Sequence, residues 1–158
     1  MQKIVANLWF DTEAEEAARF YTSLFDDSRI LAVVPYPEGG PGEPGSTMVV
    51  RFELLGQEYV AINGGPQFPF TEAVSFEVRC DDQAEVDRLW EALTADGGTE
   101  VQCGWLKDRY GLSWQIVPSR WLELVTGDDP AKVQAATKAM LGMKKLDIAE
   151  LERAYADG

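Results

Sequence analysis

The feature that most constrains the fold of this chain is an order of secondary-structure signals that occurs twice. Residues 3–10, KIVANLWF, alternate and are rich in strand formers, and Thr12 and Glu15 follow them at capping-box spacing. Residues 73–80 form a second such strand, which Asp82 and Glu85 follow at the same spacing. The two expected helix caps, Thr12 and Asp82, are 70 residues apart. This repeat predicts two similar modules within one fold.

Each module is predicted to have the order βαβββ. In the first module, apolar residues at helical spacing predict a helix from Thr12 to about Phe25. A strand over residues 30–36 and a hairpin that turns at Gly56 should follow. Residues 37–46, PEGGPGEPGS, contain four glycines and three prolines, which predict a loop that could serve a binding site.

The second module is predicted to contain strands at residues 73–80, 100–103, 105–107 and 112–117. Its helix should bury an apolar stripe formed by Val86, Leu89, Trp90 and Leu93. Asp108 to Gly111 form the expected last turn, and Trp114 and Ile116 are interpreted as core residues of the last strand. From Trp121 onward the pattern is helical, with helix starts at Asp129-Pro130 and at Asp147 with Glu150.

The composition excludes several classes of function. The chain has 14 basic and 27 acidic residues, a net charge of −13, so nucleic acid and membrane surfaces are not expected as partners. No export signal or membrane-spanning run is present, which predicts a cytoplasmic protein with Cys80 and Cys103 as reduced thiols. Histidine is absent, which removes the usual general base and the commonest transition-metal ligand.

Four segments carry a resemblance to a known family: LWFDTEAEEAARFYTSLF (residues 8–25), NGGPQFPFTEAVSF (63–76), CGWLKDRYGLSWQIVP (103–118) and MLGMKKLDIAEL (140–151). They resemble the PhnB-like branch of the glyoxalase/bleomycin-resistance/dioxygenase superfamily, or vicinal oxygen chelate proteins, over almost the whole chain. Members are often labelled 3-demethylubiquinone 3-methyltransferase-like, and most have no settled activity. The resemblance implies an α+β fold, in which two βαβββ modules form a curved mixed sheet around a cup, followed by C-terminal helices.

The expected organisation is a single domain over residues 1–158. It comprises the first module at 1–66, the second at 67–119 and a C-terminal helical extension at 120–158. The resemblance implies four metal-ligand positions, at Val5 or Asn7, at or near Ala61, at or near Ala73, and at Gln115. Only Asn7 and Gln115 offer an oxygen, whereas a stable site usually needs three or four donors, so neither a metal nor another cofactor is expected.

The residues that remain on the cup-facing strand positions combine aromatic walls with a few polar groups, which suits a small organic molecule. These candidate pocket residues are Asn7, Trp9, Asn63, Ser75, Glu77, Trp105, Lys107, Ser113 and Gln115. The alternative is a cavity whose amides only satisfy one another. Cys103 would be a reactive thiol if Lys107 lowered its pKa, or otherwise a small buried hydrophobe. Glu77 and Lys107 would act as an acid–base pair only if both were buried.

Three functions are therefore considered. The first is metal-free binding of a small molecule in the cup, with no catalytic residue identified. The alternatives are a metal-dependent lyase, isomerase or dioxygenase of the same superfamily, and a non-catalytic dimer module. Methyl transfer is discounted, because no glycine-rich turn follows a first parallel strand.

A homodimer is also expected, because the C-terminal segment has more apolar positions than short helices should hide. These positions are Leu122, Leu124, Val125, Val133, Ala136, Met140, Leu141, Met143, Leu146, Ile148 and Leu151.

Overall fold

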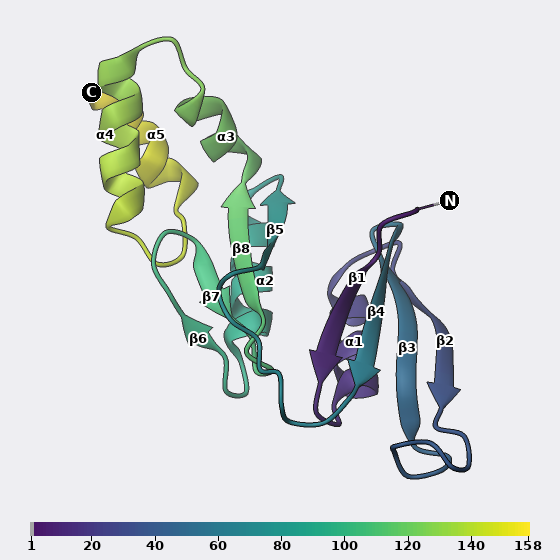
Figure 1. Cartoon of the computed structure of the whole chain (residues 1–158). Helices are drawn as coiled ribbons and strands as arrows, with labels where there is room; N and C mark the ends of the chain where they lie inside the picture. The colour runs from purple at the N-terminus through teal and green to yellow at the C-terminus, as the bar shows by residue number, and fades with distance from the viewer. Residues whose placement is uncertain (1) are drawn as a thin grey trace. The chain divides into compact units, whose positions relative to one another are not determined.

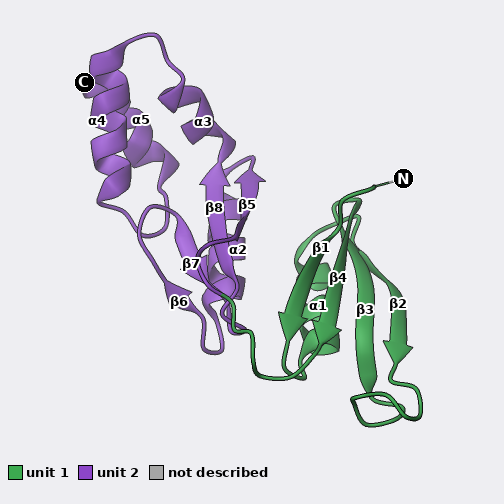
Figure 2. Cartoon of the chain, in the orientation of Figure 1, with its two compact units in different colours: residues 1–70 green, residues 71–158 purple. Residues whose placement is uncertain are grey.

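The computed structural model describes residues 2–158 and divides into two compact units, residues 1–70 and residues 71–158 (Figure 2). The boundary lies four residues beyond the expected end of the first module at residue 66. The C-terminal helices belong to unit 2. The organisation as one domain stays a prediction. No helix within residues 2–158 combines the length and the apolar character that crossing a membrane requires.

Unit 1 has the expected βαβββ order (Figure 1). Its elements are β1 (Ala6–Phe10), α1 (Ala14–Leu24), β2 (Arg29–Pro35), β3 (Thr47–Leu54) and β4 (Gln57–Asn63). The strand order is β1-β4-β3-β2, with β1 parallel to β4 and the other pairs antiparallel. The hairpin turns at Gly56, as predicted, where Leu55 and Gly56 both have positive φ.

Period-2 alternation gives this sheet one buried and one open face. The face that packs against α1 carries Leu8, Phe10, Val50, Phe52 and Ala61, all of which are buried. The strand register places the other residues together on the opposite face, which is less buried: Asn7, Trp9, Val49, Arg51, Val60 and Ile62.

The predicted start of the first helix is wrong. Helix α1 begins at Ala14 after Glu13, and Thr12 does not cap it. Both oxygens of Glu15 have other partners, since Oε1 accepts from Arg19 and Oε2 accepts from the Thr47 hydroxyl at 2.9 Å. The Glu15 carboxylate therefore cannot reach back to complete the capping box, and Asn63 Oδ1 accepts from the Ala14 amide at 2.8 Å instead.

Unit 2 repeats the βαβββ order and continues into three helices. Its elements are β5 (Ser75–Cys80), α2 (Gln83–Thr94), β6 (Thr99–Glu100), β7 (Trp105–Lys107), β8 (Ser113–Pro118), α3 (Ser119–Val125), α4 (Pro130–Leu141) and α5 (Ile148–Asp157). The strand order is β5-β8-β7-β6, with β5 parallel to β8. The Asp82 carboxylate caps α2 by accepting from the Glu85 amide at 2.8 Å, as expected. Asp129 and Asp147 cap α4 and α5 in the same way.

The strand predicted at residues 100–103 is shorter and lies earlier. Cys103 has a φ of 60°, which ends the extended conformation. The amides of Cys103 and Gly104 donate to the carbonyls of Met143 and Lys144, each at 2.8 Å. Residues 103–104 therefore attach the C-terminal helices to the sheet instead of extending β6.

The three C-terminal helices bury most of their apolar residues against one another. Leu124, Met143, Leu146 and Leu151 form a buried cluster, against which Trp121, Ala139, Met140 and Tyr155 pack. Of the apolar positions named for this segment, only Val125 and Leu141 are exposed. The expectation that these helices leave a large apolar patch is therefore wrong, because three short helices can enclose a small core that a single helix could not.

Candidate functional site

The stretch from Cys103 to Pro118 is mainly structural. The Asp108 carboxylate is buried and accepts from the amides of Tyr110 and Leu112 and from the indole nitrogen of Trp114, at 2.8, 3.1 and 2.9 Å. Trp114 and Ile116 are buried, which confirms their prediction as core residues. The aspartate in this stretch therefore ties the last turn to the last strand.

Six of the nine predicted pocket residues lie on one face of the second sheet. The register pairs Ser75 and Lys107 with Ser113, and pairs Glu77 and Trp105 with Gln115. The Gln115 amide nitrogen donates to the Ser75 hydroxyl at 2.9 Å. These residues alternate with Leu106, Trp114 and Ile116, which are buried on the face where α2 packs.

The Glu77–Lys107 pair considered from the sequence does not form. Glu77 is paired with Arg79 at 2.9 Å, and Lys107 is paired with Glu72. The hydrogen bond from Lys107 lowers the pKa of the Glu72 carboxyl, so this pair is ionised at neutral pH. Both are partly exposed ion pairs at the surface of unit 2, and such pairs usually contribute little to stability.

The other three predicted residues lie in unit 1, but not on the same face. Asn7 and Trp9 are on the open face, and the Asn7 side chain is exposed and donates to the Val5 carbonyl. Asn63 pairs with Phe10 and therefore shares the helix-facing side. Besides accepting from Ala14, Asn63 donates to the Thr47 carbonyl at 3.0 Å, so its amide joins α1, β3 and β4.

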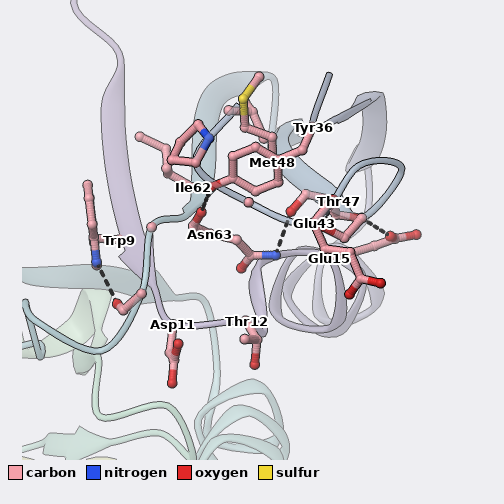
Figure 3. A pocket seen from close by; sticks show the side chains of 16 residues that line it. Trp9, Asp11, Thr12, Glu15, Tyr36, Glu43, Thr47, Met48, Ile62 and Asn63 are labelled. Atoms are coloured by element: carbon pink, nitrogen blue, oxygen red, sulfur yellow. Dashed lines mark hydrogen bonds between the residues drawn. The ribbon is translucent and has the colours of Figure 1, made fainter. Parts of the chain in front are cut away.

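Unit 1 contains a cavity of about 890 Å³ at the end of its sheet (Figure 3). This volume falls in the range of about 300–1,000 Å³ that is typical of ligand pockets. Of the nine predicted residues, only Trp9 and Asn63 line it. The sixteen lining residues are Trp9, Asp11, Thr12, Glu15, Tyr36, Pro41, Gly42, Glu43, Ser46, Thr47, Met48, Val49, Ile62, Asn63, Gly64 and Gly65.

Trp9 is held in one orientation within this wall. A Cβ on Gly64 would lie 2.1 Å from the indole ring, so the backbone of Gly64 lies directly against it. The indole nitrogen donates to the Gly65 carbonyl at 2.9 Å, and the Phe68 ring packs edge-on with its centroid 5.0 Å away. The Gly64-Gly65 pair therefore fixes the aromatic wall, because any larger residue at position 64 would displace the indole.

The glycine- and proline-rich loop supplies another part of the wall. Tyr36, at its start, donates its hydroxyl proton to the Asn63 carbonyl, and its amide donates to the Ser46 carbonyl at 2.8 Å. Gly42 lies against the Tyr36 ring, since a Cβ there would approach the ring to 2.4 Å. The loop folds back over Tyr36 and places Glu43 at the cavity.

The charged groups at the cavity are all acidic. Asp11, Glu15 and Glu43 line it, and none of the lining residues is a lysine or an arginine. Hydrogen bonds from Arg19 and Thr47 lower the pKa of the Glu15 carboxyl, which is therefore ionised at neutral pH. The cavity thus presents carboxylate, amide and hydroxyl oxygens beside aromatic and aliphatic side chains.

Fourteen of the sixteen lining residues were not predicted as site residues, among them the charged or aromatic residues Asp11, Glu15, Tyr36 and Glu43. For Tyr36 and Glu43 the available signal was the glycine- and proline-rich loop at residues 37–46 between two expected strands, since such loops often carry binding residues. The sequence did not show that the loop folds back over Tyr36 or that the Tyr36 hydroxyl donates to Asn63 at the end of β4.

The residues at the implied ligand positions do not fit a transition metal. Val5 and Ala61 offer no side-chain donor, Ala61 is buried on the helix-facing side, and Ala73 precedes β5. Within residues 2–158, no three histidine, cysteine, aspartate or glutamate side chains are grouped closely enough to hold a metal ion.

Both cysteines are free thiols with different environments. Burial raises the pKa of the Cys80 thiol to about 12, so it is protonated at neutral pH. Cys103 is partly exposed, and its sulfur lies 3.9 Å from the Leu141 carbonyl oxygen. Neither thiol lines the cavity.

Comparisons with known proteins agree with the arrangement of strands and helices. The model of the family described as 3-demethylubiquinone-9 3-methyltransferase matches residues 2–117. Among solved structures, a PhnB protein from Bacillus cereus is 39% identical, with a TM-score of 0.68, and the match covers 74% of this chain and 99% of that chain. Among proteins of curated function, none matches this sequence.

Two further solved structures are similar at lower identity. A protein from Pseudomonas aeruginosa is 23% identical with a TM-score of 0.62, covering 75% of this chain and 98% of that one. A glyoxalase/bleomycin resistance protein from Albidiferax ferrireducens is 13% identical with a TM-score of 0.45, covering 69% and 93%. The family match covers both βαβββ modules and ends at Val117, just before the C-terminal helices.

Proposed function

The chain belongs to the PhnB/3-demethylubiquinone-9 3-methyltransferase family, and on that premise we propose that it binds a small organic molecule in the cavity of unit 1 without a metal. The observation that carries this proposal is the fixed position of Trp9. Gly64 accommodates the indole, and the Gly65 carbonyl orients it. Because the Trp9 side chain is already held in one orientation before a ligand binds, it loses little conformational entropy on binding.

The polar lining supports recognition of an organic molecule. Met48, Val49 and Ile62 offer apolar surface, while the Asp11 carboxylate and the Ser46 hydroxyl offer hydrogen-bonding groups. Small-molecule sites usually combine a mostly apolar wall with a few placed polar groups.

Methyl transfer is not supported by the residues of this site. Strand β1 leads to α1 through Asp11, Thr12 and Glu13, without the glycine-rich turn by which many methyltransferases bind their cofactor. At the start of α1, the Ala14 amide already donates to Asn63 Oδ1, so this amide is not free to bind a cofactor.

The open face of the second sheet is the corresponding candidate surface in unit 2. Gln115 is held by Ser75 and is partly exposed, whereas Ser113 is buried. If this face binds a small molecule of its own, Gln115→Ala should weaken that binding more than Ser113→Ala, because the partly exposed amide can contact a ligand directly. Equal and negligible effects of both changes would argue against a binding site on this face.

The binding proposal can be tested with one glycine substitution and a matched control. Gly64→Ala would place a methyl group into the Trp9 ring, so it should displace the indole and abolish binding of any ligand that packs on it. Gly142→Ala is the control, because Gly142 is in the αR conformation and its Cβ would only make an ordinary contact with the Ala139 carbonyl at 3.5 Å. The measurement is a fragment screen monitored by the indole N–H signal of Trp9 in ¹⁵N NMR spectra.

Each function predicts a different outcome of this screen. Fragments that shift the Trp9 signal in the parent protein and in Gly142→Ala, but not in Gly64→Ala, would support metal-free binding. Binding that requires added divalent metal would favour the alternative of a metal-dependent lyase, isomerase or dioxygenase. A screen with no binder, with or without metal, would favour a non-catalytic dimer module.

A further inference from the structure

We propose that the cavity of unit 1 selects a positively charged organic molecule, such as an amine with an apolar body, over neutral or anionic molecules of the same size. This inference rests on the proposed binding function and specifies its ligand class. It follows from the presence of three carboxylates, from Asp11, Glu15 and Glu43, and of two aromatic residues, Trp9 and Tyr36, in the lining of one cavity.

The carboxylates come from three different parts of unit 1. Asp11 follows β1, Glu15 lies in the first turn of α1, and Glu43 lies in the loop between β2 and β3. Because all three line one cavity that has no lining lysine or arginine, we expect a negative local potential there. An anionic ligand would meet like charges, whereas a cation would be attracted.

The negative charge of Glu15 is already partly compensated. Arg19 pairs with Glu15 at 2.8 Å from the next turn of α1, and the Arg19 side chain is 60% exposed. No ion pair is found for Asp11 or Glu43 among residues 2–158, and both side chains are exposed. Asp11 and Glu43 are therefore the carboxylates that should contribute most to selectivity.

The aromatic residues give the same preference by a second physical effect. The π-face of an aromatic ring attracts a cation, and tryptophan does so most strongly. The indole N–H of Trp9 is used by the Gly65 carbonyl, and the hydroxyl proton of Tyr36 is used by the Asn63 carbonyl. Neither donor is therefore left for an anionic ligand, while both aromatic residues line the cavity.

Three probes with one phenylethyl-type skeleton separate charge from shape: phenethylamine as the cation, 2-phenylethanol as the neutral molecule and phenylacetate as the anion. Dissociation constants would be measured at pH 7 from the Trp9 indole N–H signal. We expect the amine to bind roughly fivefold more tightly than the alcohol, and phenylacetate to bind more weakly than either. The preference for the amine should decrease as salt is added.

Variants of the loop carboxylates identify the charge that is responsible. Glu43→Gln should weaken binding of phenethylamine by roughly two- to fivefold and leave 2-phenylethanol unchanged. Glu43→Lys should move the preference toward phenylacetate. Glu38→Gln is the matched control, because Glu38 lies in the same loop but does not line the cavity, so the affinities for all three probes should stay unchanged.

The outcomes separate this inference from the binding proposal. If the amine and the alcohol bind equally well and Gly64→Ala abolishes both, the cavity binds small molecules but charge selection is overturned. Tightest binding of phenylacetate would also overturn charge selection. If none of the probes and no fragment of the screen binds, both proposals are wrong. An equal loss of amine binding in Glu38→Gln and Glu43→Gln would show only a general charge effect and would overturn the assignment to the cavity.

Discussion

The carboxylate of Asp108 accepts a hydrogen bond from the indole nitrogen of Trp114 at 2.9 Å, and both side chains are buried in unit 2. The same carboxylate also accepts from the amides of Tyr110 and Leu112. One side chain therefore satisfies three donors around the last turn, two of which belong to the backbone.

Replacing this carboxylate should destabilise the protein. Asp108→Ala leaves the three donors without their acceptor, and each unsatisfied buried donor costs about 1–3 kcal/mol. We expect the free energy of unfolding to fall by at least about 2 kcal/mol in urea denaturation. Asp96→Asn is the control, because its ion pair with Arg109 is exposed on the aspartate side and should contribute no more than about 1 kcal/mol. Equal small effects of both changes would contradict the role of Asp108.

The two thiols should react differently with a thiol reagent. At pH 8 the buried Cys80 is protonated, because its pKa is raised to about 12, so only Cys103 should react in the folded protein. Both should react in denaturant. Cys103→Ser should abolish the reaction of the folded protein, and fast reaction of Cys80 in that variant would contradict its burial.

The same pKa predicts how stability changes at alkaline pH. The Cys80 thiol loses its proton near pH 9 when unfolded, but only near pH 12 when folded. Between these values the folded state binds more protons, so the free energy of unfolding should fall as the pH rises from about 9 toward 12. The slope from this group is at most about 1.4 kcal/mol per pH unit. Cys80→Ala should remove this contribution, whereas Cys103→Ser should keep it.

Protein purified without a histidine tag should contain well below one transition metal per chain. The chain has no histidine, and the implied ligand positions hold Val5 or Asn7, Ala61, Ala73 and Gln115. Elemental analysis by mass spectrometry is the measurement. About one zinc, nickel or iron per chain that is lost in Gln115→Ala would contradict the expectation.

The full-length chain is expected to form a homodimer that sediments at twice 17.5 kDa. The C-terminal helices do not explain a dimer, because their apolar residues are mostly enclosed. The reason is the edge strand β2, where Val33 and Val34 are 40% and 38% exposed on opposite faces of the sheet, since exposed edge strands favour association. Val33→Lys should shift sedimentation toward the monomer, whereas Leu141→Lys, on α4, should not. A monomer at high micromolar concentration would contradict the dimer.

Truncation after Ser119 is expected to give insoluble protein. It removes the Met143 and Lys144 carbonyls, which accept from the amides of Cys103 and Gly104. It also removes the buried cluster of the three helices.

Local patterns predicted most elements because they depend on contacts within a few residues. Asp82, Asp129 and Asp147 cap helices where the sequence indicated, since each carboxylate reaches an amide two or three positions ahead. Thr12 was the exception. There the more distant residues Asn63 and Thr47 supply an acceptor for the Ala14 amide and a donor for Glu15, and these contacts replace the local capping box.

The sequence by itself determined the two βαβββ modules, the buried side of β8 with Trp114 and Ile116, and the lack of histidine ligands. Periodicity and residue chemistry are local properties, so they can be read along the chain. Only the tertiary structure decided that Asn63 faces the helix, that Lys107 pairs with Glu72, and that Glu43 lines the same cavity as Trp9. These relationships depend on strand register and on where a loop returns, which are set by contacts between residues far apart in sequence.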